Sequence, residues 1–528
     1  MHVDLDETST IPEDENVFCS TVCIVGGGIA GLTLATRLAE RGINVHLLEA
    51  GGLEQEERSQ AFYATEQAGD THRGATDGRY RTFGGSSTKW GGQLLPFTRD
   101  IFSPPTGSPS RAWPISEDDL SPYYEKVQQL FGVDPLPFDS TLLPALGHPP
   151  SPFSPEITLR YSKWAPFAKR NVAHTLGPIA IASKSITVFT HANVAEFEAS
   201  DGDPSEICSV RVLNYARRVF RFKARYFVVA AGTIESARIL LCSPGIRDPH
   251  DQTGRYFHDH LSFHAGRFSS PAREAMLERL GPFFVDGTLH TCKLEASADA
   301  RGRQGLLAAM AHVIVIEPED SGTAAIRNLL RSLQSGEVKR AIALNLMPML
   351  RGAGDVFRLI VAAKFRRRRA VSKRAEVWLN IDVEQSADAE NRIRLSPQRD
   401  ALGLPIVIVE WRVNEAEQQT ALQFGRSLRV ELEGLGIAPS TWDNALVNGT
   451  SPEMLDTYHA MGGLCMGTDA SASVVDRELR VHAVRNLYVA SCAVFPSGSS
   501  SNPTFTMVAL TFRLADHLAG LLEGKSVA

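Results

Sequence analysis

Apolar and polar residues follow each other along this chain in blocks that predict strands and helices in turn. The apolar run 22–25 leads into a glycine-rich turn, and apolar residues then recur at helical spacing over 32–41. Gly42 is placed to end that helix, and 43–48 predicts a second strand. The start of the chain therefore predicts a strand, a tight turn, a helix and a strand.

The same order of elements returns twice further along the chain. Residues 224–241 predict a buried strand, a turn of small residues and a helix. Residues 487–518 predict a strand, a Gly/Ser turn and a helix that begins near Pro503, with Asn502 as its N-cap. Both segments are expected to return to the fold that the N-terminal segment begins.

The other segments mix the two patterns. Strand patterns and helix patterns alternate in no fixed order, which is typical of an α+β region. The predicted strands cover 185–197, 375–384 and 406–413, and a further strand within 210–220 is expected to pair with 185–197. A hairpin and turn are predicted within 391–403. One helix is predicted to begin at Ser116 and another to cover 415–435.

The first turn carries the clearest chemistry. Gly26, Gly28 and Gly31 have the G-x-G-x-x-G spacing, and Glu49 follows at the end of the second predicted strand. Glycines let a pyrophosphate approach the N–H groups of a helix N-terminus, and the carboxylate can accept hydrogen bonds from a ribose. The motif predicts an ADP moiety, but it does not separate FAD from NAD, and its alternative is a structural turn.

A second glycine-rich loop lies within 79–96. Gly84, Gly85, Ser86 and Ser87 stand together there, followed by two more glycines. Such a loop lets backbone amides approach a flat or anionic ligand, whereas a plain surface loop is the alternative. We expect it to contribute to the same nucleotide site.

Composition bounds the class of protein. The chain has 528 residues, of which 43% are hydrophobic and 22% charged, so two domains of an ordinary globular protein are expected. The acidic N-terminus lacks the pattern of a signal peptide, and no run of 18 apolar residues occurs. The seven cysteines are scattered, without C-x-x-C pairs. We therefore expect a cytoplasmic protein.

The formal charge of −6 hides a basic segment at 321–375, with thirteen Lys or Arg and two acids. Within it, 357–365 is amphipathic and four consecutive arginines follow. A solvated arm and a weak contact with an anionic surface through 357–374 both fit this pattern. Aromatic residues are too sparse for a nucleic-acid platform, so no nucleic acid is expected.

Taken together, several blocks resemble the glucose-methanol-choline (GMC) family of FAD-dependent oxidoreductases. They are the fingerprint with Glu49, the GGSS loop, AAGTIESARILL from Ala230, YHAMGG around His459, and NLYVASCAVFPSGSSSNPT from Asn486. The STKW sequence at 87–90 and the block around Asn502 are similar to those of the pyranose oxidase-like branch.

The resemblance implies an α/β fold, with a Rossmann-like FAD-binding domain assembled from both chain ends and an α+β substrate domain of mixed sheet and helices. The expected FAD-binding parts are 17–100, 181–260 and 448–528, the last with the catalytic pair; the expected substrate parts are 101–180, with a cover helix, and 261–447, with a basic insertion at 321–375.

The resemblance also implies site residues. His459 and Asn502 fall on the family's catalytic pair. The residues that fall on FAD contacts are Gly26, Gly28, Gly31, Glu49, Gly84, Gly85, Ser86, Ser87, Val194, Ala231, Ser491, Asn502 and Thr504.

Two positions depart from the family pattern. Lys89 stands where pyranose oxidases carry the histidine that links the flavin covalently, so FAD is expected to be non-covalent. Ser491 stands where many members have Asp, which puts the usual carboxylate contact with the cofactor in doubt.

The expected activity is oxidation of a secondary alcohol of a sugar or glycoside to a ketone. A neutral imidazole suits removal of the hydroxyl proton, and an amide N–H₂ can hold the developing alkoxide. The alternatives are a sterol-like or other apolar alcohol as substrate, an FAD-containing lyase, and a flavin-binding partner protein. A small-molecule alcohol and an electron acceptor, oxygen or another, are the expected partners.

A metal site is not expected. His258, His260 and His264 stand close together, but their spacing fits no tight zinc pattern. The sequence leaves open the substrate, the carbon oxidised, the electron acceptor and the oligomeric state.

Overall fold

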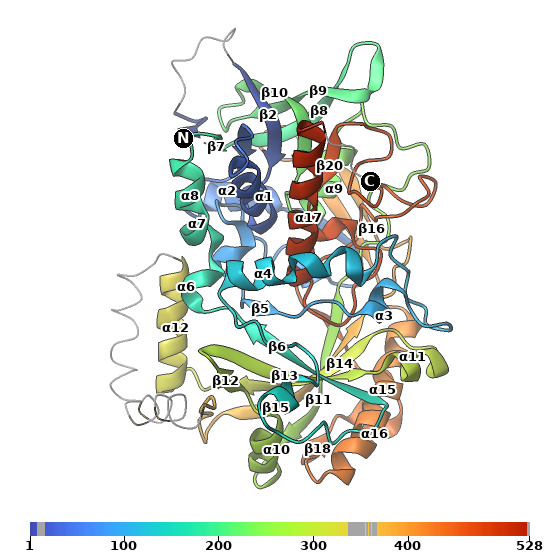
Figure 1. Ribbon diagram of the computed structural model, residues 1–528. Coiled ribbons are helices and arrows are strands. Elements are labelled where there is room, and N and C mark those ends of the chain that lie inside the picture. Colours follow the sequence, from blue (N-terminus) through green and yellow to red (C-terminus); the bar gives the residue numbers. More distant parts are fainter. Residues whose placement is uncertain (8–15, 336–353, 355–356, 358–360, 362–366, 525–528) are drawn as a thin grey trace.

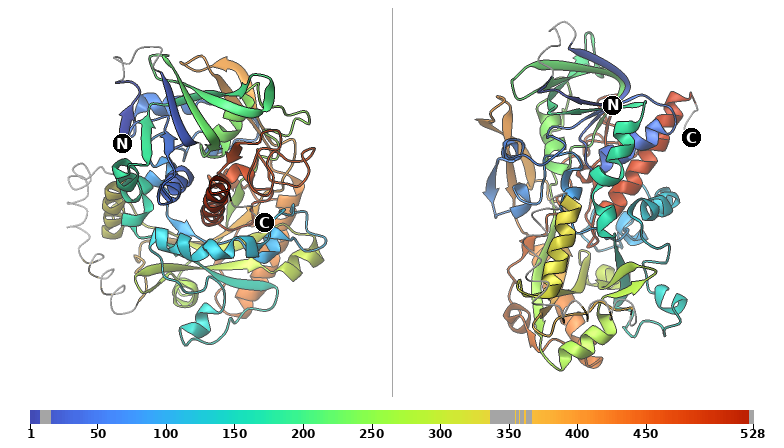
Figure 2. Two further views of the ribbon diagram at one scale, coloured as in Figure 1. Left: turned by 45° about the horizontal axis from the view of Figure 1, so that its top comes forward. Right: turned by 90° about the vertical axis from the view of Figure 1, so that its left-hand side faces the viewer.

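The computed structural model describes the chain except for residues 8–15, 336–353, 355–356, 358–360, 362–366 and 525–528. Within the described residues, an eight-stranded sheet lies at the top of Figure 1 and a nine-stranded sheet at the bottom. Figure 2 shows the same separation from two further directions. The molecule is thus built around two large, separate sheets.

The eight-stranded sheet combines segments from both ends of the chain. Its order is β1-β7-β3-β2-β10-β9-β8, and β20 pairs with β10. The pairs that join β1, β7, β3, β2, β10 and β20 are parallel, whereas β9 and β8 extend the sheet in antiparallel fashion. The strands are β1 (His2–Asp4), β2 (Val17–Val25), β3 (Val45–Leu48), β7 (Ile186–Thr190), β8 (Asn193–Ser200), β9 (Asp203–Leu213), β10 (Val219–Val229) and β20 (Leu487–Val489).

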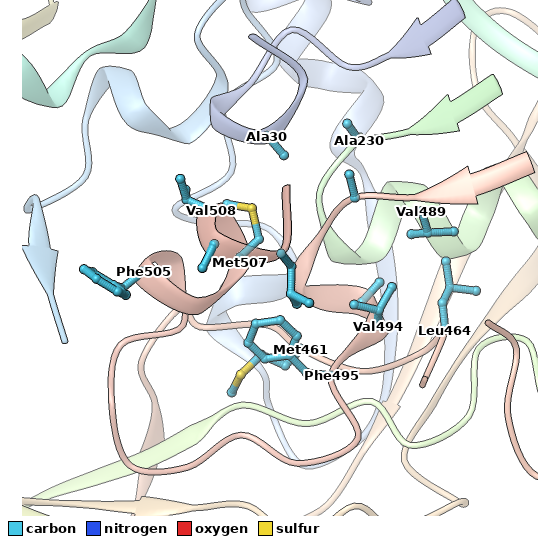
Figure 3. Close-up of a cluster of buried hydrophobic side chains, with 14 of the residues drawn as sticks. Ala30, Ala230, Met461, Leu464, Val489, Val494, Phe495, Phe505, Met507 and Val508 are labelled. Atoms are coloured by element: carbon cyan, nitrogen blue, oxygen red, sulfur yellow. The ribbon is translucent and has the colours of Figure 1, made fainter. Parts of the chain in front are cut away.

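Two apolar helices lie side by side against this sheet. They are α1 (Ile29–Ala39) and α17 (Thr504–Leu522), which pack on each other although they come from opposite ends of the chain. Figure 3 shows part of this core, with Ala30 of α1, Val489 of β20, and Phe505 and Val508 of α17 among its buried side chains. Burial of these apolar side chains holds the two chain ends together.

Among the described residues, α17 is the one helix that is long and apolar enough to cross a membrane by length and composition. Of its apolar window, 67% is buried inside the protein. Its apolar character is accounted for by its place in the core.

The nine-stranded sheet is built mainly from the middle of the chain. Its order is β18-β11-β15-β14-β13-β6-β5, with β12 beside β13 and β19 beside β11. Helix α15 (Glu415–Gly434) packs against β14 and β15. It confirms the helix predicted over 415–435. The strands are β5 (Gln93–Leu94), β6 (Ile157–Trp164), β11 (His260–Phe268), β12 (Phe283–Val285), β13 (Thr288–Ala296), β14 (Ala309–Ile316), β15 (Glu376–Glu384), β18 (Thr441–Trp442) and β19 (Leu455–Asp456).

A three-stranded sheet stands apart from both. It pairs β16 (Arg392–Arg399) with β17 (Pro405–Trp411) in antiparallel fashion and β17 with β4 (Thr65–Gly69) in parallel. The hairpin predicted within 391–403 is therefore present. The remaining helices are α2 (Glu57–Gln60), α3 (Arg99–Phe102), α4 (Tyr124–Phe131), α5 (Leu142–Ala145), α6 (Phe167–Arg170), α7 (Val172–Thr175), α8 (Gly177–Ala182), α9 (Thr233–Leu241), α10 (Ala272–Leu280), α11 (Ala298–Gln304), α12 (Gly322–Ser335) and α16 (Asn444–Asn448).

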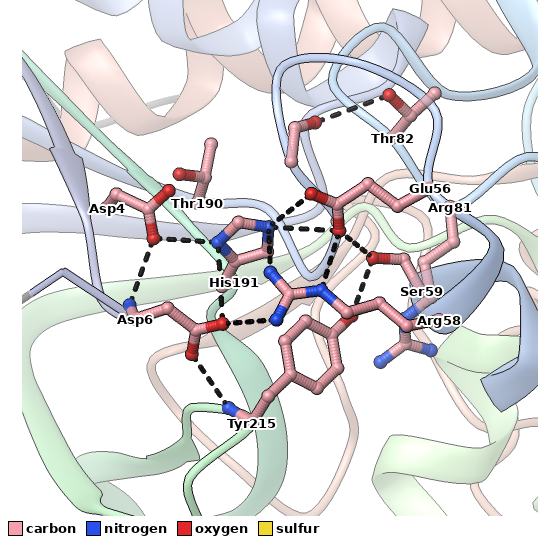
Figure 4. Close-up of polar contacts among 12 residues, drawn as sticks. Asp4, Asp6, Glu56, Arg58, Ser59, Arg81, Thr82, Thr190, His191 and Tyr215 are labelled. Atoms are coloured by element: carbon pink, nitrogen blue, oxygen red, sulfur yellow. Dashed lines mark hydrogen bonds and ion pairs between the residues drawn. The ribbon is translucent and has the colours of Figure 1, made fainter.

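The strand predicted over 185–197 is wrong as a single element. The chain turns at His191, whose φ of 54° is left-handed, so β7 and β8 lie at different places in the sheet. Figure 4 shows His191 between Asp4 and Glu56, with Nδ1 2.7 Å from the Asp4 carboxylate. The neighbour predicted within 210–220 does pair with the second part of this stretch, since β8 and β9 are antiparallel partners, but 210–220 spans the end of β9, a turn and the start of β10. The bend at His191 is fixed by polar contacts with residues that are distant in sequence.

The helix predicted from Ser116 is also shorter than expected. Ser116 forms a capping box with Asp119, but two 3₁₀ turns follow before α4 begins at Tyr124. A proline in the second turn interrupts the regular hydrogen bonds of a longer helix.

Residues 358–360 and 362–366 of the basic stretch 357–374, for which an anionic-surface contact was predicted, lie outside the described residues. Earlier in the basic segment 321–375, residues 322–335 form α12, and near the end of that segment the Arg368 guanidinium donates to the Leu277 carbonyl oxygen. The surface contact therefore stays a prediction.

Candidate active site

The glycine fingerprint lies where β2 ends and α1 begins. Gly26 has φ +109°, and a Cβ there would lie 2.4 Å from the carbonyl oxygen of Ala230. Gly28 is the N-cap of α1, and no atom lies within 4 Å of the position of its Cβ. At Gly31 a Cβ would lie 1.8 Å from the Gly26 carbonyl oxygen. Gly28 thus leaves the helix N-terminus open to a ligand, while Gly31 lets helix and strand pack closely.

The open space ahead of α1 is a cavity of about 250 Å³. Three of the predicted cofactor residues do not line it. They are Gly31, Gly84 and Asn502. Gly84, with φ +90°, shapes the turn before Gly85. Asn502 lines a second cavity, which is described below. The predicted residues that do line it are Gly26, Gly28, Glu49, Gly85, Ser86, Ser87, Val194, Ala231, Ser491 and Thr504.

Glu49 stands at the end of β3 and is 6% exposed. Its carboxylate accepts hydrogen bonds of 2.8 Å from the N–H groups of Gly27 and Gly51. Burial raises its pKa, although these hydrogen bonds oppose the effect. Glu49 therefore joins the fingerprint turn to the end of β3, and its contact with a ribose stays a prediction.

A group of arginines around Glu235 was not found by sequence reasoning. The Glu235 carboxylate lies 2.9 Å from Arg238, 3.4 Å from Arg79 and 3.8 Å from Arg81. Arg81, Glu235 and Arg238 line the cavity at the fingerprint. Three guanidinium groups against one carboxylate leave positive charge beside a helix N-terminus, which suits a pyrophosphate. The pair Arg79 and Arg81 just before the GGSS loop was the available signal.

A second cavity of about 610 Å³ adjoins the first. The two share Ala231, Thr233 and Thr504 among their lining residues. His459 and Asn502 both line the second cavity, and residues of the nine-stranded sheet line it as well. A long ligand can therefore extend from the fingerprint to the predicted catalytic pair.

The fold brings His459 and Asn502 together. The Asn502 Nδ2 donor lies 3.2 Å from His459 Nε2. Asn502 Oδ1 is buried and has no hydrogen-bond partner in the described part of the chain. The prediction that Asn502 caps the last helix is wrong, because Pro503 is the N-cap and the Asn502 side chain is directed to the histidine instead.

The protonation of His459 follows from its neighbours. His260 Nε2 lies 3.0 Å from the Gly498 carbonyl oxygen, which only accepts, so the proton of a neutral His260 ring is on Nε2. His260 Nδ1 is then an acceptor, and it lies 3.0 Å from His459 Nδ1. His459 must therefore carry its proton on Nδ1. This tautomer leaves Nε2, the nitrogen beside Asn502, as the basic atom.

Asp259 supports the same arrangement. Its Oδ1 accepts from the His459 backbone N–H at 3.0 Å and from the Thr457 hydroxyl at 3.2 Å. The Thr457 oxygen, having donated its proton, is a second acceptor 2.9 Å from His459 Nδ1. Neither Asp259, Thr457 nor His260 was predicted as part of the site, because each is a common residue without a motif of its own.

The histidines considered for a metal do not converge. His258 Nδ1 contacts the Tyr256 carbonyl oxygen, His260 contacts His459, and His264 stacks on Trp378. His72, Asp259 and Asp456 do approach one another, but Asp456 accepts from the N–H groups of Arg73 and Gly74, and Asp259 accepts from His72 and its other neighbours. The two carboxylates are thus hydrogen-bonded within the protein, whereas His72 Nδ1 has no hydrogen-bond partner among the described residues.

Comparisons with known proteins agree with this geometry. A family model described as GMC oxidoreductase matches residues 387–511, and one described as FAD dependent oxidoreductase matches 21–133. These matches give the chain a GMC oxidoreductase domain in its C-terminal part and an FAD-dependent oxidoreductase domain in its N-terminal part. Its fold is therefore the predicted one, with an FAD-binding part, and it is an FAD-dependent oxidoreductase that acts on CH–OH groups.

Several curated relatives match this chain over nearly its whole length. Paromamine 6'-oxidase of Streptomyces fradiae is 25% identical, covering 98% of this chain and 94% of that protein. The fructose dehydrogenase large subunit of Gluconobacter japonicus is 23% identical, covering 95% and 98%. Among solved structures, pyridoxine 4-oxidase from Mesorbium loti has a TM-score of 0.51 at 18% identity, covering 94% and 99%. Formate oxidase from Aspergillus oryzae has a TM-score of 0.53 at 15% identity, covering 96% and 99%.

The residues that line the two cavities fit FAD. Gly28 leaves the helix N-terminus open, the guanidinium groups near Glu235 leave positive charge, and two adjoining cavities give length for an extended cofactor. The fingerprint loop and Ser86 to Ser87 would hold the pyrophosphate, while Ala231 and Thr504 line the passage to His459.

FAD in this protein is expected to be non-covalent. Lys89 lines the second cavity, where pyranose oxidases carry the linking histidine, and an ammonium side chain cannot form that bond. Acid precipitation of the purified yellow protein should therefore leave its colour in the supernatant. Colour that remains in the washed pellet would contradict this expectation.

The acid limit of the reaction should lie well below that of an ordinary histidine. Burial, followed by the charge of the neighbouring His260, lowers the pKa of His459 to about 4. Because only the neutral ring can accept a proton, flavin reduction by substrate should persist to about pH 5 and fall as the pH approaches 4. Stopped-flow reduction across this range tests it, and an acid limb centred near the usual histidine pKa of about 6.5 would contradict it.

Proposed function

We propose that this protein oxidises a secondary alcohol of a sugar or glycoside to a ketone. The proposal rests mainly on the cavity wall that faces His459 and Asn502. Ser262, Lys293, His312, Asn380 and Asp382 line that wall. Polar groups at a buried wall need hydrogen-bond partners, and a hydroxylated substrate offers them where an apolar one does not.

The relatives agree with a sugar-like substrate. The names of paromamine 6'-oxidase, 6'''-hydroxyparomomycin C oxidase and fructose dehydrogenase indicate sugar-like alcohols. Their identities of 23–25% support the class of substrate, and the individual compound is left to experiment.

In this proposal, His459 and Asn502 carry out the steps that fall to the protein. His459 Nε2 accepts the proton of the substrate hydroxyl, since Nδ1 is held in its protonated form by His260 and Thr457. Asn502 Nδ2 donates a hydrogen bond to the oxygen as its negative charge develops. When bound, FAD supplies the hydride acceptor.

Anaerobic mixing tests the proposal. The holoenzyme is mixed with a panel of sugars, glycosides, sterols and simple apolar alcohols while the flavin absorbance is followed. Bleaching by sugars or glycosides, with a ketone as the product, is the expected result. Bleaching by sterols or apolar alcohols alone would contradict the substrate class, and no bleaching by any alcohol would contradict the proposed reaction. Admission of oxygen or a dye then identifies the electron acceptor.

A further inference from the structure

One face of the nine-stranded sheet carries polar side chains in register. Asp382 of β15 lies opposite Ser262 of β11 and opposite Met310 of β14, and Asn380 lies opposite His312. Directly paired residues point to the same side of a sheet, and residues two apart on a strand share a side. These residues therefore lie on one face, and that face lines the cavity with His459.

Lys293 extends this face from β13. Glu295 pairs with Met310, and Lys293 stands two residues before it on the same side of the strand. Lys293 is 2% exposed and lines the cavity, yet its ammonium group has no hydrogen bond to any described residue. Burial lowers its pKa to about 8. A buried amine with unused donors is costly to the fold unless something else accepts from it.

Asp382 offers the complementary group. Its side chain is 11% exposed, and Oδ1 accepts from Ser262 Oγ at 2.7 Å and from Asn380 Nδ2 at 2.9 Å. Oδ2 accepts no hydrogen bond within the described residues, and its nearest ionisable neighbour is His312 Nδ1 at 3.3 Å. Burial raises the pKa of Asp382, but His312 and Lys293 outweigh this and lower it, so the group is a carboxylate. One oxygen is held by the protein and the other is left for a donor.

Lys293 and Asp382 are close enough to the base to act on it. Lys293 lowers the pKa of His459 and Asp382 raises it. The donor and the acceptor therefore belong to the wall of the reaction cavity, at the side where the rest of a substrate would lie when its reacting hydroxyl meets His459.

We propose that Lys293 and Asp382 form a subsite for two neighbouring hydroxyl groups of a neutral sugar ring. Lys293 Nζ donates to the oxygen of one hydroxyl, and Asp382 Oδ2 accepts from the other. This inference rests on the proposed function, whose substrate it narrows. The opposite charges of the two groups cancel. An anionic sugar would be repelled by the Asp382 carboxylate, and a cationic sugar would be repelled by the Lys293 ammonium group. A neutral diol satisfies both.

The test combines variants with altered substrates. Lys293→Met and Asp382→Asn keep the shape of each side chain but remove its charge. With the best neutral sugar, each variant should raise the half-saturating concentration for flavin reduction by roughly ten- to a hundredfold, the scale of one hydrogen bond to a charged group. With the monodeoxy sugar that lacks the matching hydroxyl, the same variant should change little. Lys223→Met, at an exposed position of β10, is the matched control, expected to behave as wild type.

A pH series gives a second readout. As Lys293 loses its proton above about pH 8, the half-saturating concentration of the wild type should rise, and this rise should be absent in Lys293→Met. FAD content and thermal melting show whether each variant is folded. If a variant does not fold, the wild type still tests the subsite with monodeoxy sugars. Removal of either one of the two neighbouring hydroxyl groups from the sugar should weaken its binding to a similar degree.

Three results would overturn the subsite. They are equal use of the parent and every monodeoxy sugar, preference for a uronate or an amino sugar over the neutral parent, and folded variants with unchanged half-saturation. Failure of all sugars to bleach the flavin is a different result, since it refutes the proposed function itself.

Discussion

Replacing His459 with alanine should lower the rate of flavin reduction by about 10² to 10⁴, the usual contribution of a general base. The neighbours of the ring make this role specific. His260 and Thr457 accept from Nδ1, so the lone pair of Nε2 faces Asn502 in the cavity. Without the ring no other described side chain occupies this position to take the hydroxyl proton.

Stopped-flow reduction with the best alcohol measures this effect. His459→Ala should still bind FAD, because His459 lines the second cavity and not the one at the fingerprint. His148→Ala, on an exposed loop, is the matched control and should reduce at the wild-type rate. A near-wild-type rate in His459→Ala would remove the proposed base, whereas loss of FAD would show a structural role instead.

The nucleotide-binding half of the fold could be predicted because its signals are local. Gly26, Gly28 and Gly31 lie within one turn and one helix, and the apolar strands on either side set their frame. The return of the chain end was predicted from the strand, turn and helix around Pro503. Short-range pattern and backbone geometry were enough in both places.

His459 and Asn502 were predicted only through the family resemblance. They are far apart in sequence, and the 3.2 Å contact between their side chains exists only after β20 and α17 have joined the N-terminal strands. A histidine and an asparagine outside a motif carry no signal of this kind. The helix cap predicted for Asn502 shows how a local rule can fail where a side chain is held by a distant partner.

The polar wall was missed for a different reason. In β15, valine, leucine and isoleucine alternate with Asn380 and Asp382, which is the pattern of a strand with one solvated face. In the structure that face borders the cavity, and both residues are buried. The sequence shows the alternation, but only the packing of the two sheets shows what covers the polar side. Lys293 of β13 was missed in the same way.

Asn502→Ala should lower flavin reduction by roughly 10² to 10³, the scale found when one donor to a developing oxyanion is removed. Asn502 Nδ2 is 3.2 Å from His459 Nε2, so a substrate oxygen that gives its proton to that nitrogen lies within reach of the amide. The side chain is not needed to start α17, since Pro503 is the N-cap. FAD binding and melting temperature should therefore change little.

Asn502→Asp separates charge from shape. Aspartate keeps the volume of the side chain, but it removes the donor and places a negative charge beside the developing alkoxide, so its loss should equal or exceed that of Asn502→Ala. The double variant with His459→Ala should lose less than the product of the two single losses, because an oxygen that keeps its proton leaves little charge for the amide to stabilise. If Asn502→Asp retained the wild-type rate, or if the losses multiplied fully, the two side chains would not act on the same oxygen.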